Sequence, residues 1–214
     1  VIQAVRCTLG GFQSGQGACL FDISDEFRQL EQNKIDLRAM SVRAKNATLA
    51  GHTRLSQGGK IEATEKLSYN PTACISSQTL DSSAKDIINK TGAEFHIIDT
   101  HLQNASATLA AETGVHFKGG VIALVSSGNL YNSAEYRTKT TSINAKKRLM
   151  EGESLDIEGE QLFREADSID SKPGGRIKLE KTNFLKTRTD QVVGGCDAQN
   201  NYCESTEGKI TVSE

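Results

Sequence analysis

The chain has 214 residues, of which 36% are hydrophobic and 5% aromatic, and it contains no Trp. A globular enzyme of this size usually carries more large apolar residues, so the composition favours a narrow core of small and β-branched side chains. The formal net charge of −2, with both signs interspersed, excludes the basic footprint of a nucleic-acid-binding protein. No apolar run approaches the ~18 residues of a membrane-spanning helix, so we expect at most a peripheral association with membranes.

Residues 1–32 differ in character from the rest of the chain. The stretch 25–32 has the pattern of a short helix, because Ser24 is a suitable N-cap and acidic residues follow in the first turn. We therefore predict two units: an N-terminal capping segment over residues 1–32, which contains one helix, and a repeat domain over residues 33–214. A stacked-repeat protein needs such a cap to cover the open end of its core.

From residue 33 onward, short runs of alternating apolar and polar residues follow one another. Most are three to five residues long and have the period of two that is typical of half-buried strands. The stretch 158–166 is the main exception, because its pattern is closer to a helical period, although Gly159 weakens that interpretation. Most of the chain therefore predicts strands.

One short motif recurs along the chain. It consists of a glycine pair, a spacer, an apolar residue, a second spacer and a small or apolar residue. Three copies and a weaker fourth are found at residues 58–63, 119–124, 174–179 and 208–212. Glycine pairs favour turns, and apolar residues two apart share one face of a strand. Each copy therefore predicts a turn followed by a short strand with one buried face.

The copies and the apolar runs between them recur at a step of about 20 residues, a period typical of solenoid repeats. Ile61 and Ile122, for example, are separated by three such steps. A step of this size with several short strands predicts a chain that winds around one axis and pairs each strand with its equivalent one coil away. The predicted fold class is all-β: a parallel β-helix, or β-solenoid, with about eight coils between residues 33 and 214.

The glycine phrase at this step resembles the repeats of filamentous-haemagglutinin-like proteins, the surface adhesins and toxin carriers of Gram-negative two-partner secretion. The stretch 121–132 and the Ser/Thr-rich stretch 137–142 are also similar to that family's repeats. The resemblance covers about residues 40–180. It implies a right-handed parallel β-helix that serves as a secreted stalk or an adhesive rod.

A second resemblance competes with the first. The stretches 49–55 and 59–69 are similar to the repeats of periplasmic lipopolysaccharide-transport bridge proteins. That resemblance implies an open stack of strands with an apolar groove that carries lipid. The many small residues at inward positions fit a closed, packed solenoid better.

A third hypothesis is a polysaccharide-cleaving β-helix, because such enzymes build acid/base sites from residues on successive coils. Asp99 beside His101, with His116 about one coil later, would form such a cluster, and the alternative is that these are surface residues. The acidic stretch 151–165 predicts paired carboxylates for glycosidic hydrolysis, a calcium site or a solvated face. We assign no catalytic, cofactor-binding or metal-ligating residue and expect no cofactor.

The five cysteines form two close pairs near the chain ends, with one left over. They are Cys7 with Cys19, Cys196 with Cys203, and Cys74. The pairs are open to three interpretations: disulfides that staple the two ends in an oxidising compartment, reduced thiols, or metal ligands. The sequence alone does not determine their connectivity.

The leading hypothesis is a non-enzymatic, secreted or surface β-solenoid that acts as an adhesin, stalk or presentation scaffold. We expect it on the surface of a Gram-negative bacterium, with the periplasm as the alternative. Its expected partners are a protein or glycan of a host or neighbouring cell, or a second copy joined end to end, and no nucleic acid. Since residues 208–212 read as an ordinary rung, we expect the C-terminal end to pair with another chain or to continue in a longer parent.

Overall fold

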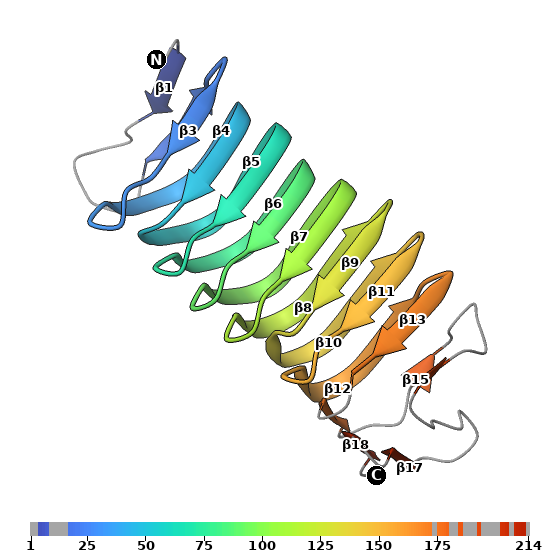
Figure 1. Ribbon diagram of the computed structural model, residues 1–214. Helices are drawn as coiled ribbons and strands as arrows, with labels where there is room; N and C mark the ends of the chain where they lie inside the picture. Colours follow the sequence, from blue (N-terminus) through green and yellow to red (C-terminus); the bar gives the residue numbers. More distant parts are fainter. Residues whose placement is uncertain are drawn as a thin grey trace.

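The computed structural model describes residues 4–8, 17–172, 175–179, 184–185, 192–193, 202–205 and 208–212. Throughout these residues the chain is all-β, with about seven turns of a solenoid and coils of about 21 residues. The coils stack into a rod, with the N-terminal strands at one end and the C-terminal strands at the other (Figure 1). The predicted parallel β-solenoid and the predicted length of its step are therefore confirmed.

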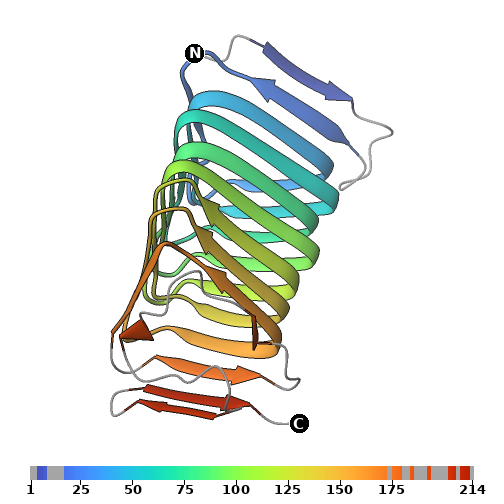
Figure 2. The ribbon, with the colours of Figure 1, turned by 90° about the vertical axis from the view of Figure 1, so that its right-hand side faces the viewer.

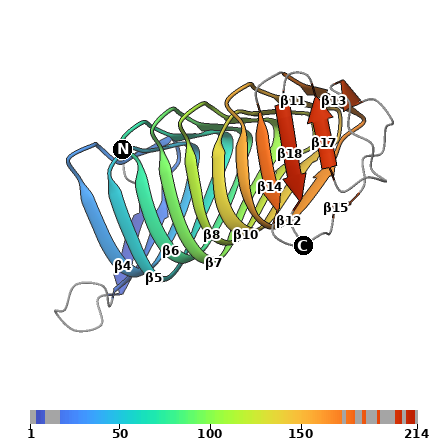
Figure 3. The same cartoon turned by 90° about the horizontal axis from the view of Figure 1, so that it is seen from below.

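Each coil consists of three consecutive runs of strand, and equivalent runs of successive coils form three long faces of the rod (Figure 3). In four coils these runs are continuous, as β4 (Lys34–Leu49), β5 (His52–Tyr69), β6 (Cys74–Asn89) and β7 (Glu94–Ala111). In β7 the first face is 94–97, the second is 100–105 and the third is 108–111.

The next three coils are each divided into two strands. They are β8 (His116–Ser126) with β9 (Asn129–Asn132), β10 (Glu135–Ala145) with β11 (Arg148–Glu151), and β12 (Asp156–Glu165) with β13 (Ser168–Ser171). The longer strand of each pair supplies the first and second faces, and the shorter strand supplies the third. The pairing between these coils is parallel, so residues of the three faces stack on their equivalents one coil away, with register shifts at several corners.

Antiparallel strands lie at both ends of the parallel stack (Figure 2). At the N-terminal end, β1 (Ala4–Thr8) pairs antiparallel with β2 (Ala18–Asp22), which pairs in parallel with the second face of β4. At the C-terminal end, β17 (Tyr202–Ser205) pairs antiparallel with β18 (Gly208–Val212). Between them, β14 (Arg176–Leu179), β15 (Phe184–Leu185) and β16 (Val192–Val193) continue the three faces. The strand β18 stacks in parallel on β14, as a rung does.

The helix predicted over 25–32 is wrong. Residues of this stretch form β3 (Glu26–Arg28), which pairs in parallel with the third face of β4 and places Phe27 beside Ala47. A helix of two turns is marginal on its own, and the pairing buries Phe27 in the core instead. The helical pattern of 158–166 is overridden in the same way, because β12 pairs with β10 along almost its whole length.

Inward side chains of the three faces fill the interior of the rod. Phe95, Phe117 and Tyr136 stack on the inside of the first face, with ring centroids 4.9 Å and 5.1 Å apart, and each is at most 1% exposed. Burying an aromatic or branched side chain of this kind contributes roughly 1.5–3 kcal/mol to folding. The core needs few aromatic residues, because β7, β8 and β10 each bury a single Phe or Tyr ring.

The first two glycine phrases lie at the corner between the first and second faces. Gly119 has φ +139°, and a Cβ there would lie 1.6 Å from the carbonyl oxygen of Ile97, so only glycine fits where the two coils approach. The two phrases are out of phase by two positions, because Gly58 is equivalent to Val121 rather than to Gly119. The phrase therefore indicates the corner correctly, but it does not give the register.

Candidate functional site

The structure does not assemble the cluster that the sequence suggested around His101. This imidazole points into the core, where it is 2% exposed, and burial lowers its pKa to about 3. Asp99 lies outside, at an exposed corner, and accepts a hydrogen bond from Gln78. His116 also lies outside, with its Nδ1 3.2 Å from a carboxylate oxygen of Glu135. The three side chains therefore occupy three separate environments, and His101 is neutral at physiological pH.

Acidic residues of the stretch 151–165 are likewise divided between the interior and the surface. Glu151 is 3% exposed and accepts a hydrogen bond of 2.6 Å from the guanidinium of Arg164, inside the core. Asp156 and Glu158 lie outside, where both contact Arg137 at 2.8 Å and 3.2 Å. The solvated-face interpretation therefore applies to part of the stretch only, because Glu151 belongs to the core.

Several hydrogen bonds inside the core join the third face of one coil to the second face of the next. The first connects Tyr69 with Ser82 at 2.6 Å. One coil later, Asn89 and Gln103 form a reciprocal amide pair at 2.8 Å and 2.9 Å. The Glu151–Arg164 ion pair occupies the equivalent place three coils further on. We call these three contacts the cross-coil bonds; they satisfy polar groups whose burial would otherwise be costly.

Tyr69 and Tyr136 are both fully buried, and their hydroxyls are used within the core. Burial raises the pKa of Tyr69 well above its usual range, although the hydrogen bond to Ser82 opposes the shift. Burial also raises the pKa of Tyr136, whose hydroxyl donates to the Asn132 side chain at 2.6 Å. Both phenols therefore stay protonated and act as hydrogen-bonding groups of the core.

Outside the rod, the first face of three central coils carries ionisable residues only. Its six outward positions in β7, β8 and β10 are Glu94, His96, His116, Lys118, Glu135 and Arg137, in two rows that run from coil to coil. We call this set the charged grid. His96 contacts Glu94 at 3.7 Å, His116 contacts Glu135 at 3.2 Å, and Arg137 contacts the next coil. Exposed contacts of this kind contribute little to stability, so the sequence is free to vary here.

The second face of the same three coils carries no ionisable residue at its outward positions. These form a grid of three rows by three coils: Thr100, Leu102 and Asn104 in β7, Val121, Ala123 and Val125 in β8, and Thr140, Ser142 and Asn144 in β10. We call this set the neutral grid. All nine are at least partly exposed, and Val121 reaches 40%. Charged residues border it, with Asp81 one coil before it and Glu165 one coil after it.

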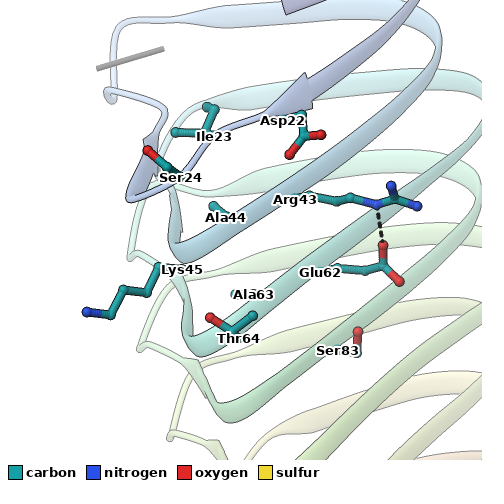
Figure 4. Close-up of a pocket in the computed structure, with 10 residues that line it drawn as sticks. All are labelled: Asp22, Ile23, Ser24, Arg43, Ala44, Lys45, Glu62, Ala63, Thr64 and Ser83. Carbon is teal, nitrogen blue, oxygen red and sulfur yellow. Dashed lines mark hydrogen bonds and ion pairs between the residues drawn. The ribbon is translucent and has the colours of Figure 1, made fainter. Parts of the chain in front are cut away.

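A hollow of about 620 Å³ lies nearer the N-terminal end, where the second face of β4 and β5 turns toward the third (Figure 4). Ile23, Ala44 and Ala63 give it buried apolar lining. At its edge, Glu62 accepts a hydrogen bond from Arg43 at 3.0 Å and contacts Lys60 at 2.6 Å. These two cations hold the pKa of the Glu62 carboxyl below its usual range. The ionisable lining residues Asp22, Arg43, Lys45 and Glu62 include two of each sign, so the hollow has no net charge with which to select an ionic ligand.

Cys7 and Cys19 lie at the N-terminal end of the rod. In the register of β1 and β2, Cys7 lies directly opposite Cys19, and the latter is buried. At the other end Cys203 lies on β17, whereas Cys196 falls outside the described residues. Cys74 is on the first face, between His52 and Glu94 in its row, and it is a free thiol. Its pKa is raised, chiefly by partial burial and secondarily by Glu94, so it is protonated at neutral pH.

Within the described part of the chain, no three His, Cys, Asp or Glu side chains are arranged to hold a metal ion. Nor do these residues include a helix long and apolar enough to cross a membrane. Comparison with known protein families, curated proteins and solved structures gives no match. The two grids therefore have to be interpreted from their own chemistry.

Sequence reasoning missed both grids, although their residues are visible in the sequence. The missing information is the register, because the coils have unequal lengths. The equivalent first-face positions are Ile75, Phe95, Phe117, Tyr136 and Ile157, and no two successive intervals between them are the same. Any fixed step would therefore scatter the members of each grid over different rows.

Proposed function

We propose that this chain is a non-enzymatic β-solenoid that acts as an adhesive rod or a presentation scaffold, secreted or at a cell surface. The observation that carries the proposal is the pairing of the charged and neutral grids on adjacent faces of the same three coils. A rigid, filled core holds each outward row at the strand spacing of ~4.8 Å. Such a rod presents two chemically different surfaces to a partner without a conformational change.

The filled interior favours this proposal over the lipid-transport bridge. A lipid carrier needs an apolar space that an acyl chain can enter. Here the inward residues of all three faces are packed together, as with Ile75, Ile61 and Leu109 of the first, second and third faces, none of which is exposed. The alternative of a polysaccharide-cleaving enzyme loses its motivating cluster, since His101 is enclosed in the core.

The proposed partners are a protein or glycan of a host or neighbouring cell. The proposed location is the surface of a Gram-negative bacterium, as the resemblance to filamentous-haemagglutinin-like repeats implies, with the periplasm as the alternative. End-to-end association of two copies remains a proposal as well. Among the described strands, β1 and β17 each pair along one side only, so their outer edges are candidates for such association.

We also propose that Cys7 and Cys19 form a disulfide that locks the N-terminal strand pair. Directly opposed residues of antiparallel strands have Cα atoms about 4.5–5.5 Å apart, which suits a disulfide. Formation converts two thiols to one disulfide and passes two electrons to a disulfide oxidant of an oxidising compartment. Peptide mapping without reduction tests the proposal: a crosslinked peptide pair containing both cysteines supports it, and alkylation of both thiols in the native protein overturns it.

The adhesive role is tested with beads that carry the purified protein. We expect them to bind epithelial or bacterial cells more than albumin-coated beads do, and soluble protein should compete. The location is tested with antibodies on the source cells, where labelling of intact cells supports a surface rod. Labelling only after permeabilisation would favour the periplasm, and binding equal to albumin on every cell type would overturn the adhesive role.

A further inference from the structure

We infer that the neutral grid binds a neutral oligosaccharide, an inference that rests on the proposed adhesive function. The grid consists of the nine outward residues of the second face in β7, β8 and β10, at residues 100–104, 121–125 and 140–144. Of the surfaces described above, it alone combines hydrogen-bonding groups with apolar contact area and lacks charge.

The polar members of the grid match the chemistry of sugar hydroxyls. Thr100, Thr140 and Ser142 present hydroxyls, and Asn104 and Asn144 present amides, so the surface offers both donors and acceptors. Two of these are held in place by the next coil. The Asn144 Nδ2 donates to Glu165 at 3.1 Å, and the Thr140 hydroxyl donates to Gln161 at 3.4 Å. Preorganised groups lose less entropy when a ligand binds.

The middle strand of the grid is apolar. Val121, Ala123 and Val125 lie side by side along β8, with Leu102 next to Ala123 in β7. The C–H faces of a sugar ring can pack on such a strip while its hydroxyls reach the polar residues on either side. A ligand with a fixed charge would instead lose hydration without gaining a counter-charge, which is costly. The grid itself therefore favours a neutral sugar over an acidic or basic one, because charged residues lie only at its border.

The size of the grid argues for a short ligand rather than a protein. Five residues of a strand span about 17 Å and three strands span about 14 Å, so the grid covers about 240 Å². A stable protein interface uses about 800 Å² on each partner. The surrounding corners carry charged, exposed residues such as Asp99, Lys139 and Lys146, which limit extension of a neutral contact. An oligosaccharide of a few units fits within this border.

Saturation-transfer NMR of the full chain with cellohexaose, laminarihexaose and mannohexaose tests the inference, with hexagalacturonate as the acidic counterpart. We expect binding of at least one neutral hexasaccharide and none of hexagalacturonate. Ala123→Lys places a charge at the centre of the grid and should weaken binding at least tenfold. Ala110→Lys makes the same change at an outward, partly exposed position of the third face and should leave binding unchanged.

A second variant measures a polar contact without adding bulk. Asn104→Ala removes an exposed amide and should weaken binding roughly fivefold to tenfold, as expected for loss of one or two hydrogen bonds. Thermal unfolding of each variant shows whether the fold is kept. If Ala123→Lys misfolds, Asn104→Ala still locates binding, and unchanged binding in a folded Asn104→Ala variant together with no preference for neutral hexasaccharides would overturn the inference.

The outcomes separate this inference from the adhesive role. If coated beads bind cells but no neutral hexasaccharide binds, or Ala123→Lys binds like the wild type, the grid assignment is overturned and the adhesive role stands. If hexasaccharide binding depends on Ala123 but beads do not adhere, the adhesive role fails. If the wild type dimerises in sedimentation and Ala123→Lys abolishes the dimer, the grid is a self-interface and the oligosaccharide assignment is overturned.

Discussion

The first and second faces of the three central coils share one core but have opposite surfaces. In β7, β8 and β10 the six outward residues of the first face are all ionisable, and the nine of the second face are all uncharged. Their inward neighbours are alike in burial, as Phe117 and Ile122 of β8 show with 1% and 2% exposure. The comparison teaches that packing of the core constrains the inward residues of each strand. The outward residues of the two faces can therefore differ in chemistry while the core stays the same.

The largest effect should come from the inside of the first face. Phe117→Ala removes the middle ring of the Phe95–Phe117–Tyr136 stack, and the cavity should lower the free energy of unfolding by about 3–5 kcal/mol. Urea unfolding followed by circular dichroism measures it. The matched variant is Lys118→Ala, at the next, outward residue of β8, which should change stability by less than ~0.5 kcal/mol. Similar losses for the two variants would contradict the division into inner and outer residues.

A comparably large effect should follow from splitting the buried ion pair. Arg164→Met leaves the Glu151 carboxylate in the core without this guanidinium and should cost about 3–5 kcal/mol. The double variant Glu151→Leu with Arg164→Met should recover most of that loss, since two apolar side chains can replace a buried pair. Denaturant midpoints of the two variants check this, and a double variant as unstable as the single one would refute it.

A smaller, pH-dependent effect should come from His101 on the inside of the second face. Burial lowers its pKa to about 3, against ~6.5 in an unfolded chain. Between these values the unfolded chain binds a proton that the folded chain does not. The contribution of His101 to stability is therefore fully present above about pH 6.5 and is lost as the pH falls toward 3.

Lowering the pH from about 7.5 to about 5 should cost about 2 kcal/mol through this residue. His101→Leu, which matches Leu80 in the same inward row, should remove that part of the pH dependence. Ile122→Leu, at the equivalent inward position of β8, serves as the control, since it changes no titratable group. Urea midpoints at the two pH values provide the measurement, and an unchanged slope in His101→Leu would show that this imidazole titrates normally.

The smallest effect should be found on the charged grid itself. Arg137→Ala removes ion contacts with Asp156 and Glu158, and we expect a loss of ~0.5 kcal/mol that disappears at high salt. Thermal unfolding at low and high ionic strength checks it. A loss of several kcal/mol that resists salt would mean that the charged grid is part of the structural framework rather than a free surface.

The fold class could be predicted from the sequence because the strongest local patterns recur in every coil of the solenoid. Period-two runs and glycine corners both follow from a filled solenoid, and each was recognisable without the register. The side on which a residue lies was harder to predict. Leu102 has the apolar character of an inward residue, yet it faces outward, whereas its neighbour His101 faces inward.

The reason lies in the residues on either side of this pair. Phe95, Ile97, Ala105 and Leu109 of β7 all have odd residue numbers, as His101 does, and all are buried. A shift that buried Leu102 would expose them, which costs far more than burying one imidazole. Gln103 lies within 3.2 Å of the His101 Nε2 and so supplies the polar partner that makes the burial acceptable. Gln103 is itself held by Asn89 of the preceding coil, and that contact between coils is not contained in the pattern of a single strand.

The cross-coil bonds determine whether whole coils can be added to this rod or removed from it. Repeat proteins are often treated as strings of interchangeable modules. Here the coils are not interchangeable, because each cross-coil bond joins a different pair of residues. Tyr69 bonds to Ser82, Asn89 to Gln103, and Glu151 to Arg164. Deleting residues 90–111, one whole coil, would put the Asn89 amide opposite Leu124, which is equivalent to Gln103 one coil later. The buried polar pairs are thus specific to the order of the coils. After a duplication or deletion of a coil, further substitutions would be needed to restore the hydrogen-bond partners at the new junction.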